Sequence, residues 1–304
     1  MSSGRPDLIC ATATPLQKDL TCHRELFLDH CSNLLARGCN GVVLFGTTGE
    51  GPYFGSTERR SVLEFLLGQG LAPARVIVGA GSASLADAVE LTRHALSVGI
   101  RGVLLMPPFF LRAAITEAGV FRFYAELIER TADPRLRLLL YNFPAITGIT
   151  LSIELIRRLH GAFGDVVQGV KDSGGDWQRT TAYLEAFPEL AVYTGTEVHA
   201  RRVTRLGGVG TICGLANVLP QAMRQYLDAS EEEAERWHSL IGAVDDALCA
   251  TPFLPACKAA IGLASGADDW RRVLPPSSEL DDRDLEQLTR TLRAVADRYQ
   301  VPVG

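Results

Sequence analysis

Residues 136–171 read LRLLLYNFPAITGITLSIELIRRLHGAFGDVVQGVK, and this stretch decides the fold. It begins with an apolar run, Leu136–Tyr141, continues through an amphipathic segment, Ser152–Leu159, and ends in a second apolar run, Val166–Lys171. Short apolar runs without alternation are typical of parallel strands that are covered on both faces. The stretch therefore predicts a strand, a helix and a second, parallel strand.

The same unit recurs along the chain. Eight apolar runs of this kind are predicted to be strands: Leu8–Thr12, Gly41–Phe45, Arg75–Ala80, Gly102–Met106, Leu136–Tyr141, Val166–Lys171, Leu190–Thr194 and Val209–Cys213. Helical patterns lie between them: Glu25–Arg37, Glu58–Gly68, Leu85–Val98, Glu117–Thr131, Ser152–Leu159, Asp176–Phe187 and Glu197–Leu206. Eight alternations predict an α/β fold, a closed (β/α)8 TIM barrel.

An open doubly wound sheet is the alternative fold. That fold would carry a glycine-rich phosphate turn after the first strand, where this chain reads Ala-Thr-Pro-Leu. Past Leu219 the pattern becomes helical without strands, in the segments Gln221–Ala229, Glu231–Ala250, Phe253–Leu263 and Ser278–Tyr299. We therefore expect a barrel over residues 1–229 that carries the active site, and an all-helical C-terminal extension over residues 230–304 that packs on it.

Composition excludes several classes of function. The net charge of −5 and the absence of a Lys/Arg-rich run argue against binding to nucleic acid. The seven cysteines form no CxxC pair, so we expect buried reduced thiols and no metal site. Neither a signal peptide nor an apolar stretch of membrane-spanning length is visible. A cytoplasmic protein that does not bind membranes is expected.

Lysine is rare in this chain. Lys18, Lys171 and Lys258 are the lysines among 30 basic residues, so arginine supplies nearly every positive charge. Lys171 nevertheless ends an apolar strand, at the end of the barrel where active sites lie. A lysine amine can lose its proton and attack a carbonyl, which arginine cannot do. A structural lysine paired with Asp172 or with another buried carboxylate is the alternative, and position alone leaves both readings open.

Two neighbouring strand ends carry further candidate groups. Tyr141 could move protons beside Lys171, or it could fill the mouth of the barrel with its hydroxyl on a backbone group. Thr47 and Thr48 lie in the glycine-flanked turn that begins at Gly46. Such a turn can offer hydroxyls and backbone N–H groups to a carboxylate, or it can be a helix cap.

Four motifs resemble one known family. They are Gly46-Thr47-Thr48-Gly49-Glu50, Tyr141-Asn142-x-Pro144, Gly169-Val170-Lys171-Asp172-Ser173 and the run Gly210–Asn217. In this order and spacing, over nearly the whole chain, they are similar to the dihydrodipicolinate synthase / N-acetylneuraminate lyase family of class I, pyruvate-dependent aldolases.

The resemblance implies roles for these residues. Lys171 would form a covalent imine with a 2-oxo acid, Tyr141 would move protons, and Thr47 would contact the tyrosine hydroxyl. The remaining substrate-binding residues would be Thr48, Gly46, Gly195, Glu197, Ile212, Ile146 and Phe110. No metal or organic cofactor is implied, because the imine on Lys171 carries the chemistry. The resemblance also implies a homotetramer built as a dimer of dimers.

Departures from the family pattern indicate the branch. The synthase branch usually has an arginine where this chain has Ile146, and a tyrosine within the segment that here reads Pro108-Phe109-Phe110. Losing a carboxylate clamp and a proton relay argues against that synthase. Cys213-Gly214 stands where a sialic-acid lyase tends to have a glycine–serine pair, and Val198 stands where it tends to have a glutamate. These differences argue against sialic acid as the substrate.

The sequence therefore predicts a lyase that joins pyruvate to an aldehyde or cleaves such a product. Its substrate would be a 2-oxo-3-deoxy sugar acid or a similar 4-hydroxy-2-oxo acid. The alternatives are a 4-hydroxy-tetrahydrodipicolinate synthase, a dehydratase or deaminase of the same family, and a non-catalytic 2-oxo-acid-binding protein. Product analysis separates them, because an aldolase releases pyruvate and an aldehyde, whereas a dehydratase leaves the carbon chain intact.

Overall fold

The apolar runs form a closed parallel barrel in the computed structural model, which describes residues 5–301. Neighbouring strands pair in chain order and β8 closes the barrel on β1. The strands are β1 Asp7–Ala11, β2 Gly41–Leu44, β3 Val76–Gly79, β4 Gly102–Leu105, β5 Arg137–Asn142, β6 Val167–Asp172, β7 Ala191–Thr194 and β8 Gly210–Cys213. Each begins and ends within one residue of its predicted run, and the TIM-barrel prediction is confirmed.

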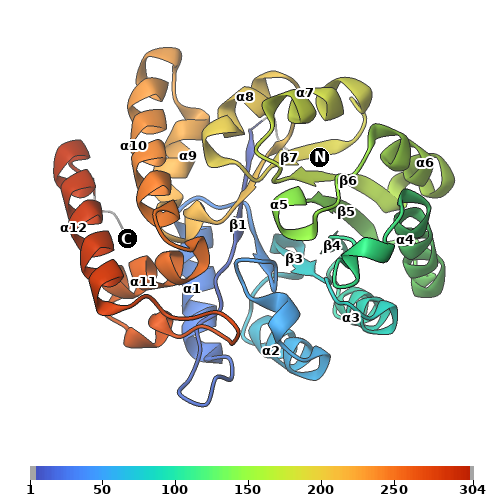
Figure 1. Cartoon of the computed structure of the whole chain (residues 1–304), viewed down its shortest axis with the longest axis horizontal. Coiled ribbons are helices and arrows are strands. Elements are labelled where there is room, and N and C mark those ends of the chain that lie inside the picture. The colour runs from blue at the N-terminus through green and yellow to red at the C-terminus, as the bar shows by residue number, and fades with distance from the viewer. Residues whose placement is uncertain (1–4, 302–304) are drawn as a thin grey trace.

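Helices follow the strands and form the outer layer, except for the short α5 (Pro144–Thr147), which lies at the mouth of the barrel (Figure 1). They are α1 Arg24–Ala36, α2 Ser56–Gly68, α3 Leu85–Ser97, α4 Glu117–Thr131, α5 Pro144–Thr147, α6 Ile153–Phe163, α7 Trp177–Ala186, α8 Ala200–Arg205 and α9 Pro220–Asp228. Single turns of 3-10 helix lie in several of the connections. The short α5, directly after β5, was not predicted from the sequence.

Two apolar layers explain why the strand runs do not alternate. Ile9, Ala11 and Ile212 belong to a small cluster inside the barrel. Leu8 and Cys10, the alternate residues of β1, belong to the larger cluster that the strands form with the helices. Both faces of each strand are therefore buried, and each fully buried aliphatic side chain contributes roughly 1.5–3 kcal/mol to folding.

The C-terminal helices extend the outer layer on one side. Figure 1 shows α10 (Glu231–Cys249), α11 (Phe253–Ser265) and α12 (Asp282–Tyr299) gathered there, with α10 packed against α9 and α12. The last helix begins at Asp282 rather than at Ser278 as predicted, because Asp281 caps it by accepting a hydrogen bond from the Asp284 N–H. The division of the chain at residues 229 and 230 stays a prediction.

The described residues also bear on membranes, metals and thiols. Within residues 5–301 no single helix is long and apolar enough to cross a membrane; α10 and α11 together pass the length and composition test, but they are bent by 113°. The same residues hold no group of three or more His, Cys, Asp or Glu side chains placed for a metal ion. All seven cysteines are free; six are buried as expected, but Cys249 is exposed.

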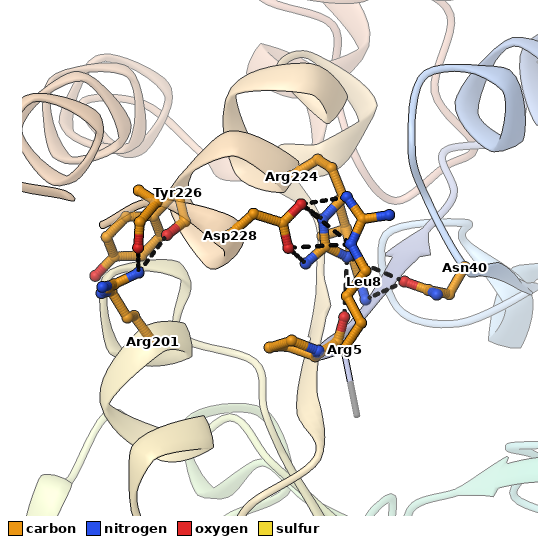
Figure 2. A network of polar contacts seen from close by, with 9 residues as sticks. Arg5, Leu8, Asn40, Arg201, Arg224, Tyr226 and Asp228 are labelled. Carbon is orange, nitrogen blue, oxygen red and sulfur yellow. Dashed lines mark hydrogen bonds and ion pairs between the residues drawn. The ribbon is translucent and has the colours of Figure 1, made fainter. Parts of the chain in front are cut away.

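Arg224 on α9 forms hydrogen bonds with residues at the N-terminal end of the barrel (Figure 2). Its guanidinium donates two hydrogen bonds to Asp228, of 2.9 and 2.6 Å, one to the Pro6 carbonyl and one to Asn40 Oδ1. Asn40 Oδ1 also accepts from the Leu8 N–H at 2.9 Å. The side chain of Arg224 is 8% exposed. It therefore ties α9 to the residues that precede β1 and β2, at the end opposite the predicted active site.

We expect Arg224→Ala to lower the free energy of unfolding by about 2 kcal/mol, because the Pro6 carbonyl and the other part-buried acceptors of this guanidinium lose a donor at once. Urea unfolding monitored by circular dichroism measures this loss. Arg293→Ala, which removes an exposed arginine of α12, is the matched control and should change stability by less than about 0.5 kcal/mol. Equal effects of the two substitutions would contradict this role for Arg224.

Candidate active site

Lys171 points into the barrel because β6 contains a bulge. The pairing of β5 with β6 runs from Leu138 opposite Val167 to Leu139 opposite Gly169, so Gln168 has no partner. The side chains of Val167 and Val170 both face the helices, although the two residues are three positions apart. In a regular strand, only residues an even number of positions apart share a face. Without the extra residue, a strand of period two would turn Lys171 outward. The bulge therefore brings Lys171 beside Tyr141, its partner on β5.

Lys171, Tyr141 and Thr47 form a chain of polar contacts. Lys171 Nζ donates to Tyr141 Oη at 3.2 Å and lies 4.3 Å from the centroid of the tyrosine ring. Tyr141 Oη lies 3.2 Å from Thr47 Oγ1. Lys171 and Tyr141 are only 4% and 3% exposed. The structure thus places together the three residues that the sequence analysis nominated as catalytic.

Asp172 is engaged elsewhere, so it is not the partner of Lys171. Its Oδ1 accepts from Asn142 Nδ2 at 2.8 Å and from the Gly174 N–H at 3.0 Å, and its Oδ2 accepts from Thr180 Oγ1 at 2.6 Å. These contacts tie β6 to β5 and α7. The neighbour of the Lys171 amine is a phenol, and the alternative of a lysine paired with Asp172 is wrong.

A buried ion pair holds the turn that carries Thr47 and Thr48. Glu50, with φ near +55°, closes the turn. Its Oε2 accepts from Lys258 Nζ at 2.6 Å and its Oε1 accepts from the Leu274 N–H at 2.6 Å. Both charged side chains are 0% exposed. The sequence analysis missed Lys258, although the rarity of lysine that singled out Lys171 applied to it equally.

The turn is also crowded by backbone. A Cβ at Gly51 would lie 1.8 Å from the Phe45 carbonyl oxygen, and a Cβ at Gly79 on β3 would lie 2.4 Å from the same atom. No side chain fits at either position. The turn that presents Thr47 and Thr48 is therefore packed directly against its own strand and the next one.

A cavity of about 530 Å³ lies at the C-terminal ends of the strands, and Lys171, Tyr141 and Thr47 line it. Of the predicted site residues, those that line it are Thr47, Thr48, Tyr141, Ile146, Lys171, Gly195, Glu197 and Ile212. Gly46 is not on the wall; its carbonyl accepts from the Gly51 N–H. Phe110 is not on the wall either, since it is 86% exposed and its neighbour Phe109 lines the cavity instead.

The C-terminal helices contribute wall residues that the sequence analysis did not assign. Asp245 and Cys249 come from α10, and Phe253 and Leu254 come from α11. Because they lie far along the chain, in segments without a motif, only their apolar helical pattern was visible in the sequence. The cavity is thus built by both parts of the chain, not by residues 1–229 alone.

Glu197 is a buried carboxylate in this wall. It is 7% exposed, and its Oε1 accepts from the Leu215 N–H at 3.1 Å. Burial, with a further contribution from the charge of Asp245, raises the pKa of Glu197 to about 7. The hydrogen bond from Leu215 and the charge of Lys171 act in the opposite direction.

We expect Lys258→Met to destabilise the protein by about 3–5 kcal/mol, because it leaves the charge of Glu50 buried without a partner. The double variant Lys258→Met/Glu50→Gln should recover part of this loss, since the glutamine is neutral and can still accept from the Leu274 N–H. Urea unfolding measures both, with Lys18→Met at an exposed lysine as the control. A double variant that is less stable than Lys258→Met would contradict the ion-pair argument.

The effect of Glu197→Gln on stability should depend on pH. The pKa of Glu197 is raised from 4.5 to about 7 in the folded chain, so ionising this group opposes folding. The penalty is absent below about pH 4.5, grows as the pH rises, and is complete above about pH 7. We expect Glu197→Gln to match the wild type at low pH and to be more stable at pH 8, by on the order of 3 kcal/mol. Thermal unfolding across this range tests it, and a difference that does not vary with pH would refute it.

The comparisons with known proteins agree with the family expected from the motifs. The model of the dihydrodipicolinate synthetase family matches residues 6–295. An uncharacterized DapA-like lyase of Chloroflexus aurantiacus is 30% identical over 272 residues, which are 88% of this chain and 90% of the relative. A putative 2-dehydro-3-deoxy-D-gluconate aldolase, YagE of Escherichia coli, is 27% identical over 86% of this chain and 87% of its own length.

Among solved structures, the dihydrodipicolinate synthase from Agrobacterium tumefaciens superposes with a TM-score of 0.88. It is 34% identical in sequence, and the match covers 94% of this chain and 98% of that one. The barrel fold and the family expected from the motifs of this chain are thus found together in one relative.

Proposed function

Because the chain belongs to the dihydrodipicolinate synthetase family and is a lyase of that family, we propose that it acts as a Schiff-base-forming aldolase on a 2-oxo-3-deoxy sugar acid or a similar 4-hydroxy-2-oxo acid. One observation carries the proposal. The Lys171 amine is buried in a cavity of about 530 Å³, at 3.2 Å from a tyrosine hydroxyl, and it has no carboxylate within ion-pair distance among the described residues.

The chemistry would proceed on the Lys171 amine. The neutral amine attacks the ketone carbon of the 2-oxo acid, and the hydroxyl of the resulting carbinolamine takes a proton from Tyr141 and leaves as water, which gives a protonated imine. Cleavage of the bond between C3 and C4 sends its electron pair toward this imine and forms an enamine, while the 4-hydroxyl loses its proton and becomes the aldehyde. Protonation of the enamine at C3 and addition of water then release pyruvate and restore the amine. No metal or organic cofactor enters these steps.

Tyr141 and the threonine turn would serve the reaction in different ways. Tyr141 Oη lies between Lys171 Nζ and Thr47 Oγ1. After giving its proton to the departing water, it would take the proton of the 4-hydroxyl and return it to the enamine. Thr47 would orient that phenol. Thr48, with the backbone N–H groups of the turn, would bind the carboxylate of the 2-oxo acid, because hydroxyls and amides are donors suited to an anion.

The cavity wall bears on which substrate tail is bound. A Cβ at Gly214 would lie 2.7 Å from the ring of Phe253, so a serine at this position would collide with the α11 side chain. This favours a substrate other than sialic acid. Ile146 lines the cavity where the synthase branch has its arginine, which disfavours an aldehyde with its own carboxylate.

A second candidate is a 4-hydroxy-tetrahydrodipicolinate synthase. The relative of Methanopyrus kandleri with that name, 30% identical over 94% of this chain, is the observation that favours it. The two candidates share the pyruvate imine and differ in the aldehyde. Fast turnover of pyruvate with aspartate semialdehyde would support the synthase, and fast release of pyruvate from 2-oxo-3-deoxy sugar acids would support the aldolase.

We further propose a cytoplasmic homotetramer, a dimer of dimers. Phe110 and Leu111, which are 86% and 72% exposed, lie beside Phe109 at the cavity and are apolar side chains that a subunit contact would cover. Light scattering coupled to gel filtration measures the assembly.

We expect pyruvate and borohydride to leave a reduced pyruvyl adduct on Lys171, identified by peptide mass spectrometry. Lys171→Arg should give no adduct and no turnover, because the guanidinium keeps its proton. Folding of the variant is checked by circular dichroism. An active Lys171→Arg variant would refute the proposal.

Tyr141→Phe should reduce kcat by about 10²–10⁴-fold, because it removes the proposed proton carrier while keeping the ring. Tyr193→Phe is a matched control, since Tyr193 also lies inside the barrel, one strand beyond Lys171, but donates to Asp7 at the opposite end. Steady-state kinetics with one 4-hydroxy-2-oxo acid compares the two variants. Similar losses in both would mean that Tyr141 acts through packing alone.

A further inference from the structure

The cavity wall carries more acidic than basic side chains. Among the described residues that line it, Lys171 is the one basic side chain, whereas three are carboxylates: Glu50, Glu197 and Asp245. Glu50 is neutralised by Lys258, which lies outside the cavity. In the proposed reaction, the Lys171 nitrogen becomes the protonated imine, whose positive charge lies next to the carboxylate of the 2-oxo acid itself. Two carboxylates, Glu197 and Asp245, therefore remain on the wall that the rest of the substrate meets.

Glu197 has an oxygen free to face a ligand. Its Oε1 accepts from the Leu215 N–H, but its Oε2 has no hydrogen-bond partner among residues 5–301, and the residue is 7% exposed. Since Glu197 lines the cavity, a hydroxyl group of a ligand could donate to this oxygen.

Asp245 adds a second carboxylate from the C-terminal helices. It lies on α10, and its Oδ1 accepts a weak hydrogen bond from the Cys249 thiol at 3.8 Å. The two carboxylates influence one another, since the charge of Asp245 is the second cause, after burial, of the raised pKa of Glu197. An anionic group brought to this wall would meet two acceptors and no donor with a positive charge.

We propose that Asp245, with Glu197, makes the outer cavity select an uncharged hydroxyaldehyde and reject aldehydes that carry a carboxylate or phosphate. Asp245 is then a specificity-determining residue supplied by the C-terminal helices rather than by the barrel. The inference rests on the proposed function, because it concerns the part of the substrate beyond the imine with Lys171.

The test compares two 2-oxo acids that differ in one terminal group. 2-Oxohexanoate ends in a methyl and 2-oxoadipate, with the same number of carbons, ends in a carboxylate. Each is trapped on Lys171 with borohydride at a series of concentrations, and mass spectrometry of the intact protein gives the efficiency of trapping. We expect the wild type to trap 2-oxohexanoate about tenfold more efficiently than 2-oxoadipate.

Asp245→Asn separates charge from simple apolar preference, because it removes the charge and keeps the shape. It should narrow the ratio between the two acids to about threefold or less. Asp246→Asn is the matched control: it removes an equal charge from the next residue of α10, which is exposed and does not line this cavity, and it should leave the ratio within about twofold of the wild type.

The outcomes are distinguishable. Equal trapping of the two acids by the wild type, or equal effects of Asp245→Asn and Asp246→Asn, would overturn the charge selection while the imine on Lys171 stands. Absence of an adduct with either acid and with pyruvate would overturn the proposed function and this inference with it.

Discussion

The ion pair between Lys258 and Glu50 is the contact on which the site depends. It joins α11, late in the chain, to the turn after β2, and neither side chain is exposed. Such a pair gains little net energy, because both charges lose their water, but losing one member leaves the other stranded. The ion pair instead fixes a position, because it holds the turn that carries Thr47 and Thr48 from outside the barrel. The C-terminal helices are therefore part of the candidate active site.

The position of this turn also affects the position of the Lys171 amine, the group proposed to react. Thr47 contacts Tyr141, and Tyr141 contacts Lys171. Displacing one of these side chains would therefore also displace its neighbour. Lys171 keeps its place through the bulge at Gln168 and through Gly169, where a Cβ would lie 2.1 Å from the Ala191 carbonyl oxygen. A local irregularity in one strand thus decides which way Lys171 points.

The sequence predicted the strands well because their signal is local. Each buried strand is an apolar run with polar or glycine-rich ends, and burial on both faces makes the run continuous. It could not reveal the bulge, because Gln168 sits in an apolar run with Gly169, and a skipped partner changes pairing rather than composition. It placed Phe110 in the site although Phe109 lines the cavity, because one residue of turn geometry decides between them. Asp245 was invisible as a wall residue, since its place depends on how α10 packs.

The two parts of the chain therefore supply different properties to one cavity. Groups that react must be held to within fractions of an ångström, and the barrel strands, packed on both faces, provide that rigidity. Groups that discriminate between substrate tails act through charge, which reaches further and tolerates looser placement. A carboxylate on α10 can therefore be gained or lost without disturbing Lys171. We infer that the helices beyond the barrel are where substrate preference changes most easily in this architecture.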